Sequence, residues 1–177
     1  DRAALSPPAS TEQLLHPRRA YLGERDEPQE LPASSIGARL PAGFARVAST
    51  TLGEFGVGAF VRFAGDPVRA VRVARGWDGD RATVWRLDDV RVLEWEVVFD
   101  SEADAAEAID ALRKVFQRRF HRTVAGDGIS IEMDAEKTRV RAADGDGAVR
   151  SSARREGRSV RWLDERTGRV DLRALTD

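Results

Sequence analysis

The sequence predicts an α+β domain: an antiparallel β-sheet with two to three helices packed on one face, preceded by a proline-rich extended arm. Six of the seven prolines lie within the first 41 residues, where apolar periodicity is weak. Two strand-like segments, 82–87 and 90–99, are joined by Asp88-Asp89 and are typical of a β-hairpin. A long amphipathic segment follows the hairpin, and this succession of helices and strands favours an antiparallel α+β domain.

The arm contains one short helix. Ser10 is followed three residues later by Gln13, which is the spacing of a capping box. Because a proline disfavours helical backbone at the residue before it, Pro17 should end this helix near His16. We expect the arm to span residues 1–48 and the folded domain to span residues 49–177, with apolar residues becoming sparse after about residue 126.

Two more helices are predicted at the start of the domain. Thr51 and Glu54 form a second capping box. The apolar residues that follow share one helical face, namely Leu52, Phe55, Ala59, Phe60 and Phe63, although Gly53, Gly56 and Gly58 weaken the helix. Asp66 as N-cap and Pro67 at the first helical position open the next helix, which ends at Gly76. The β-branched residues of this second segment leave a strand as the alternative.

The hairpin and the long helix supply most of the predicted core. Leu93, Trp95, Val97 and Phe99 alternate with Glu94, Glu96 and Val98, so one face of this strand should be buried and the other largely wet. Ser101 caps the long helix and Asp104 completes its capping box. The apolar stripe of the helix should lie across the sheet and contains Ala105, Ala108, Ile109, Leu112, Val115, Phe116 and Phe120. Short strands are predicted later, at 129–133, 137–142, 159–163 and 169–172, with a loop at 144–147.

The run Gly76–Arg81 is the most unusual feature of the chain. It concentrates acids, glycines and an indole where a helix gives way to the sheet, and its candidate binding residues are Trp77, Asp78, Asp80 and Arg81. The alternative is a tight turn at residues 78–80. In that case Trp77 is buried against the same core as Trp85 and Trp95, the acids accept backbone N–H groups, and Arg81 pairs with one of them.

Composition excludes several classes of function. The chain has 29 basic and 30 acidic residues, a balance that argues against a dedicated binder of nucleic acid or anionic membranes. It has no cysteine, which excludes disulfides and thiol chemistry. No apolar stretch approaches the ~20 residues of a membrane span. Because the chain begins at Asp1, we expect a processed product or a piece of a longer protein.

No catalytic, metal or cofactor site is predicted. Glu12 and His16 are four residues apart, but zinc needs at least three protein ligands, and a histidine at the end of a helix is the simpler interpretation. The same interpretation applies to His121. The acidic loops at 78–80 and 144–147 lack the closing glutamate of a calcium loop. Glu94 and Glu96 could be presented as a glycosidase pair, but a solvated strand face explains them better.

One local cluster of basic residues stands out. Between Arg150 and Arg161 the chain has five arginines, and Trp162 adjoins them. Arginines interleaved with aromatic residues can bind single-stranded nucleic acid. A solvated hairpin is the alternative and agrees with the neutral total charge.

Several short motifs resemble one family, in the same order. Ser10-Thr11-Glu12-Gln13-Leu14-Leu15-His16-Pro17 resembles the STEQxLHP segment of predicted extracytoplasmic proteins of bacteria and archaea, often labelled metallopeptidase-like surface proteins or lipoproteins. Thr51–Glu54, Gly76–Arg81, and Trp95 followed by Asp100–Ala105 resemble the TLGE, GWxGDR and DSEADA signatures of that family, although Phe99 stands where a tryptophan is usual. The resemblance covers residues 7–125. The HExxH helix of the family lies upstream of the STEQ segment and is absent here, so no catalytic role is carried over.

The resemblance implies a non-catalytic C-terminal module of a metallopeptidase-like secreted or surface protein. Such a module would pack on an upstream domain of the same parent or bind a protein partner through the Trp77 corner, and it would be extracytoplasmic. Two alternatives remain open. One is a hydrolase with the acids of the 78–80 turn in its site, and the other is a free-standing interaction domain with a basic surface at Arg150–Arg161.

Overall fold

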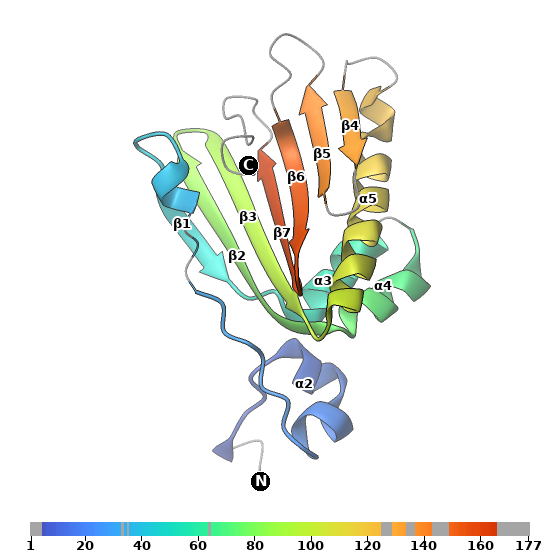
Figure 1. Ribbon diagram of the computed structural model, residues 1–177. Coiled ribbons are helices and arrows are strands. Elements are labelled where there is room, and N and C mark those ends of the chain that lie inside the picture. The colour runs from blue at the N-terminus through green and yellow to red at the C-terminus, as the bar shows by residue number, and fades with distance from the viewer. Residues whose placement is uncertain are drawn as a thin grey trace.

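The chain folds into one antiparallel sheet flanked by helices, as the computed structural model in Figure 1 shows. The structure describes residues 5–32, 34, 36–63, 65–124, 129–133, 137–142 and 149–165. Within these residues the sheet has seven strands in the order β1-β2-β3-β7-β6-β5-β4. The strands are β1 (Ala45–Thr50), β2 (Trp77–Leu87), β3 (Val90–Phe99), β4 (Ile129–Met133), β5 (Lys137–Ala142), β6 (Val149–Glu156) and β7 (Ser159–Glu165).

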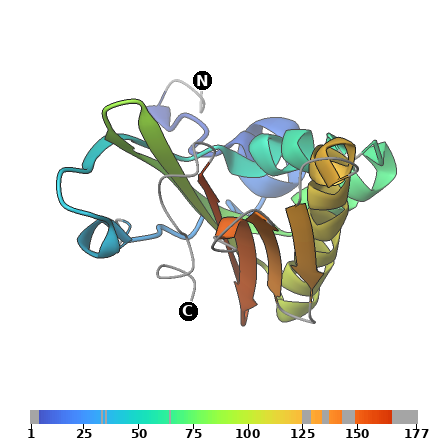
Figure 2. The ribbon, with the colours of Figure 1, turned by 90° about the horizontal axis from the view of Figure 1, so that it is seen from above.

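Three helices cover one face of the sheet, which confirms the predicted α+β class. They are α3 (Gly53–Arg62), α4 (Pro67–Ala74) and α5 (Glu102–Val124). The long α5 runs alongside the later strands in both views (Figures 1 and 2). The arm contributes α2 (Thr11–Leu15), a π-helical turn η1 (Pro17–Tyr21) and a 3-10 turn η2 (Ile36–Arg39). None of the described helices is long and apolar enough to cross a membrane.

The main core lies between the sheet and its helices. Phe60 of α3 contacts Trp95 and Trp162, with ring centroids 5.5 Å and 4.5 Å away, and the two indoles lie 6.2 Å apart. Val160 and Ala153 bring β7 and β6 into the same cluster. Such aromatic contacts add packing energy beyond the area that they bury.

A second core lies on the opposite face of the sheet and contradicts two predictions. Trp85 pairs with Val92 across the β2–β3 hairpin and packs with Ile36 and Leu40. The side-chain alternation of β2 therefore directs Trp85 away from Trp95. The face of β3 expected to be wet is also covered, and Glu94 is only 2% exposed.

The helix ends were predicted correctly where the capping residue lies within a few residues of the N–H group that it caps. The Ser10 hydroxyl accepts from the Gln13 N–H, and α2 ends at His16 before Pro17. Asp66 caps α4, which rules out the alternative of a strand, and Ser101 accepts from the Asp104 N–H at the start of α5.

Three local predictions were wrong or incomplete. Residues 77–81 do not form a turn, because β2 starts at Trp77 and contains a bulge between Trp77 and Gly79. The buried apolar residues of α3 are Val57 and Val61, whereas Leu52, Phe55 and Phe63 are exposed. Strand β1 was not predicted and begins at Ala45, in the range assigned to the arm, whereas β6 was anticipated only by the alternative of a hairpin over Arg150–Arg161. The predicted loop at 144–147 and strand at 169–172 lie outside the described residues.

Candidate functional site

The buried carboxylate of Asp80 joins three parts of the chain. Its Oδ1 accepts hydrogen bonds from the Trp77 indole N–H at 2.9 Å and the Gly53 backbone N–H at 2.8 Å. Its Oδ2 accepts from the Trp95 indole N–H and the Leu52 backbone N–H, both at 2.9 Å. Asp80 is 3% exposed and Trp77 is 1% exposed. Four N–H donors thus satisfy both oxygens of one buried acid, which we call the Asp80 joint.

The Asp80 joint also supplies the N-terminal cap of α3. The expected capping box of Thr51 and Glu54 does not form, since the N-cap Leu52 has no side-chain cap of its own. Asp80 instead reaches from β2 to the first N–H groups of the helix, which have no partners inside the helix. A carboxylate at this end is also stabilised by the helix dipole. The cap therefore fixes α3 to the sheet.

Gly53 permits the arm to approach this helix end. Its φ of +71° lies in the left-handed region that favours glycine. A Cβ at this position would overlap the Thr11 hydroxyl, which itself accepts a hydrogen bond from the Phe55 N–H. The STEQ and TLGE motifs are therefore in direct contact, although about forty residues separate them.

We predict that Gly53→Ala lowers the free energy of unfolding by roughly 2 kcal/mol, because it combines a strained φ with an overlap. Urea denaturation of the purified protein measures this value. Gly157→Ala is a matched control, since Gly157 also has a positive φ, +55°, but nothing lies within 4 Å of its Cβ position. If Gly53→Ala costs no more than Gly157→Ala, the close approach of Thr11 has no energetic role.

The remaining motifs meet at the same end of the sheet. A Cβ at Gly79 would overlap the backbone carbonyl oxygen of Gln29. The backbone N–H of Gln29 donates to the backbone carbonyl of Asp78 at 2.6 Å. A Cβ at Gly76 would lie 2.8 Å from the Asp104 Cβ in the first turn of α5. Both glycines of the GWDGDR run are therefore required by close packing, one against the arm and one against α5.

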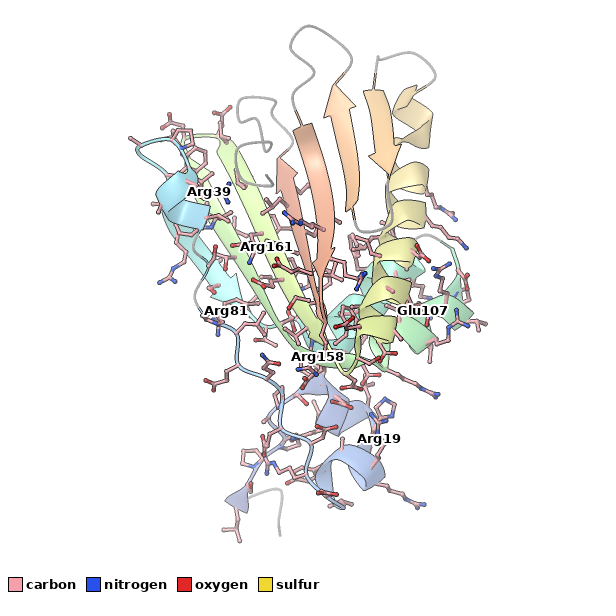
Figure 3. All side chains as sticks on the ribbon, viewed as in Figure 1. Arg19, Arg39, Arg81, Glu107, Arg158 and Arg161 are labelled. Carbon is pink, nitrogen blue, oxygen red and sulfur yellow. The ribbon has the colours of Figure 1, made fainter. Side chains whose placement is uncertain are left out.

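The other candidate residues of the corner form surface bridges. Arg158 donates to Asp78 Oδ2 at 3.3 Å and to the Gln29 side chain at 3.1 Å. Arg81 does not pair with either acid of the corner; it donates to the Leu31 carbonyl at 3.0 Å. Figure 3 shows Arg81 and Arg158 at the edge where the arm meets the sheet. Of the four predicted binding residues, Trp77 and Asp80 belong to the buried joint, and Asp78 and Arg81 attach the arm.

Glu12 and His16 have separate partners. His16 Nε2 lies 2.9 Å from Glu54 Oε1, and Glu12 Oε1 accepts from Arg19 at 2.5 Å. Burial raises the pKa of Glu12, the nearby Asp26 raises it further, and Arg19 lowers it. In the described part of the chain, no group of three potential metal ligands occurs. The His121 side chain and the acidic loop at 144–147 lie outside the described residues.

Glu94 is the second buried acid of interest. It lies on the sheet face opposite the Asp80 joint, with Oε1 3.5 Å from Arg161 Nε. Its Oε2 has no hydrogen-bond partner within the described residues. Burial raises its pKa to about 7, Arg161 acts to lower it, and Glu96 acts to raise it. The predicted solvated pair of Glu94 and Glu96 is therefore wrong, because both acids flank one arginine and Glu94 is buried.

Two arginines of the predicted basic surface at Arg150–Arg161 form ion pairs with acidic side chains. Arg161 binds Glu96 at 3.1 Å, and Arg158 binds Asp78. Trp162 is 6% exposed and packs in the main core, so it offers no face for a base to stack on. The side chain of Arg150 is outside the described residues.

A groove between α2, α3 and α4 is an open concave surface beside these motifs. It has a volume of about 540 Å³, within the range typical of ligand pockets. Its lining comprises Leu15, His16, Glu54, Phe55, Gly58, Ala59, Arg62, Pro67, Ala70, Val71 and Ala74. Leu15, Phe55 and Val71 are 51%, 65% and 52% exposed. Sequence reasoning missed this groove, although the many apolar residues of 52–63, too many for one buried face, were a signal for it.

The fold is that of an α+β domain. Its buried Asp80 carboxylate links the start of α3 to β2 and β3 through four hydrogen bonds. A family model described as a domain of unknown function (DUF8575) matches residues 39–175, and the chain belongs to this family. No curated protein matches the chain, and no solved structure does. The matched range contains α3, α4 and the Asp80 joint but not α2, so the groove is lined by residues from both sides of its boundary.

Proposed function

We propose that this domain is a non-catalytic interaction module that binds a protein partner in the groove between α2, α3 and α4. The groove itself carries the proposal, because Leu15, Phe55 and Val71 line it and are each more than half exposed. A contiguous exposed apolar surface of this kind typically marks a binding site. The binding surface thus shifts from the Trp77 corner to the groove, since Trp77 is buried.

We further propose that the module is the C-terminal part of a metallopeptidase-like secreted or surface protein. The ordered STEQ, TLGE, GWxGDR and DSEADA motifs support this origin and an extracytoplasmic location. Reading the coding sequence upstream of Asp1 tests it. An HExxH helix in the preceding domain is the expected result, and a start codon immediately before Asp1 would contradict the proposal.

The rival functions have less support. A hydrolase based on residues 78–80 would need a free acid, but both oxygens of Asp80 hold two N–H donors each and Asp78 binds Arg158. A basic binding surface at Arg150–Arg161 would need free arginines, and Arg158 and Arg161 pair with acids.

Site-specific cross-linking tests the groove. A photoreactive benzoylphenylalanine at position 55 should cross-link a protein partner in cells that produce the parent protein. The same group at position 68 should not, because Val68 is 78% exposed on α4 but does not line the groove. Equal yields from the two positions would contradict the proposal.

A pair of variants on one helix gives the matching binding test. Val71→Asp should weaken binding of the cross-linked partner at least tenfold, because it places a charge among apolar contacts. Val68→Asp should leave the affinity unchanged. Both positions are exposed, so both variants should unfold at the wild-type temperature. Equal losses of affinity in the two variants would show that the groove is not the binding surface.

A further inference from the structure

We infer that the partner segment is an amphipathic α-helix that lies parallel to α3, with its N-terminal end at Glu54 and a carboxylate near its C-terminal end at Arg62. This inference rests on the proposed function of the groove and adds the chemistry and direction of the occupant.

The shape of the groove favours a helix. Its lining on α3 recurs at Glu54 and Phe55, Gly58 and Ala59, and Arg62, which is the i, i+4 spacing of one helix face. Along α3 the groove extends roughly 12 Å, because eight helical steps of about 1.5 Å separate Glu54 from Arg62. A helix of two to three turns covers this length. An extended strand would find no backbone partners, because the N–H and C=O groups of α3 and α4 are bonded within the helices.

Small residues form the floor of the groove and larger ones form its walls. Gly58 and Ala59 of α3 face Ala70 and Ala74 of α4, and the Cβ position of Gly58 is 3.4 Å from the Ala74 Cβ. Apolar side chains of a third helix can therefore insert between Phe55 and Val71. This is the packing of side-chain ridges into the groove between two helices.

The two ends of the groove differ in charge. At one end, Glu54 is 4% exposed, and its Oε2 has no hydrogen-bond partner within the described residues. His16 is bonded to the other oxygen of Glu54. At the opposite end, the exposed Arg62 has no acidic partner among the residues that the structure describes, because the neighbouring Asp66 is engaged as the N-cap of α4.

This polarity sets the direction of the bound helix. The first turn of a helix offers unpaired N–H groups and the positive end of the helix dipole, which suit the acidic end at Glu54. The last turn carries the negative end of the dipole, and an acidic side chain there would pair with Arg62. Arg72 of α4 is already paired with Glu107 and does not compete for that acid.

Two synthetic peptides of identical composition test the inference. Both are twelve-residue peptides with one apolar stripe, held helical by the same side-chain staple so that the opposite charge placements do not change their helicity. The forward peptide carries two lysines in its first turn and two glutamates in its last turn, and the reversed peptide exchanges them. Fluorescence anisotropy of labelled peptides measures the affinity of each for the full chain. We expect the forward peptide to bind about three- to fivefold more tightly, as is typical of a few exposed charge pairs.

Three variants distinguish the proposed direction of the bound helix from the proposed use of the groove as a binding site. Arg62→Glu should abolish or invert the preference, whereas Arg46→Glu, the same charge change on exposed β1, should preserve it. Equal affinities of the two peptides, both lost in Val71→Asp, would overturn the inference and leave the groove as the binding site. No binding of either peptide at millimolar concentration would overturn both. Equal effects of Arg62→Glu and Arg46→Glu would also overturn the inference, since they would reflect net charge alone.

Discussion

Asp80→Asn is expected to lower the free energy of unfolding by roughly 3 kcal/mol, although it keeps the shape of the side chain. The reason is the symmetry of the joint. Each oxygen of Asp80 accepts one indole N–H and one backbone N–H. Whichever way the amide of an asparagine is turned, its NH₂ group faces two N–H donors and two hydrogen bonds are lost. The negative charge at the start of α3 is lost as well.

Urea denaturation followed by tryptophan fluorescence measures this loss, because Trp77 and Trp95 both contact the carboxylate. Asp89→Asn is the control, since Asp89 lies exposed in the β2–β3 turn. A domain of this size has a total stability of about 5–15 kcal/mol, so a loss of this size is a large fraction of it. An unfolding midpoint of Asp80→Asn equal to that of Asp89→Asn would contradict a structural role of the joint.

The second large effect is a loss of stability as the pH rises, caused by Glu94. Its pKa is raised to about 7 in the folded state by burial, against an ordinary value of about 4.3 for an unfolded chain. Between these values the folded state holds a proton that the unfolded state has lost. Stability therefore decreases as the pH rises through this window, by about 3–4 kcal/mol in total. Glu94→Gln mimics the protonated acid and should remove this contribution.

Urea denaturation of the wild type and Glu94→Gln at pH 5 and pH 8 makes the test. The variant should be the more stable protein at pH 8, and its advantage should be much smaller at pH 5, close to the unfolded pKa of Glu94. Burial also raises the pKa values of Glu12 and Asp100, so a shallower slope of the same sign should remain in the variant. Parallel slopes for the two proteins would mean that Glu94 is not protonated in the folded state.

Short-range signals in the sequence predicted much of the fold. Caps formed by neighbours, such as Ser10 with Gln13 and Asp66 with Pro67, gave helix starts that the structure confirms. The hairpin around Asp88-Asp89 was predicted with its second strand, Val90–Phe99, correct to the residue. These features depend on interactions within a few residues, and the sequence displays those directly.

Interactions between residues that are distant in the sequence could not be predicted in the same way. The cap of α3 comes from Asp80, which is 27 residues beyond Gly53. Sequence reasoning instead assigned this cap to the adjacent Thr51 and Glu54. The bulge after Trp77 likewise changes the alternation of β2, so Trp77 shares the sheet face of Trp95 whereas Trp85 lies on the other face. Ile36 and Leu40 cover part of the second face, on which Glu94 is also buried, and no local pattern indicated this.

The candidate site was predicted only in part. Trp77 and Asp80 were singled out as unusual, but their hydrogen bonds with Trp95 and with α3 depend on the tertiary fold. The groove was hidden because Phe55 and Ala59, which line it, were assigned to the buried face of the helix. In the structure Phe55 is 65% exposed, since fixing the helix start to Asp80 turns Val57 and Val61 toward the sheet.

Asp80 and its indole donors are expected to form one cooperative structural unit. A double-mutant cycle of Asp80→Asn and Trp95→Phe tests it most directly. Removing the Trp95 N–H leaves only one backbone donor facing the asparagine NH₂ on that side. The double variant should therefore be more stable than the sum of the single losses predicts, by about 1–2 kcal/mol. Additive losses, with no coupling energy, would contradict a cooperative unit of Asp80 and Trp95.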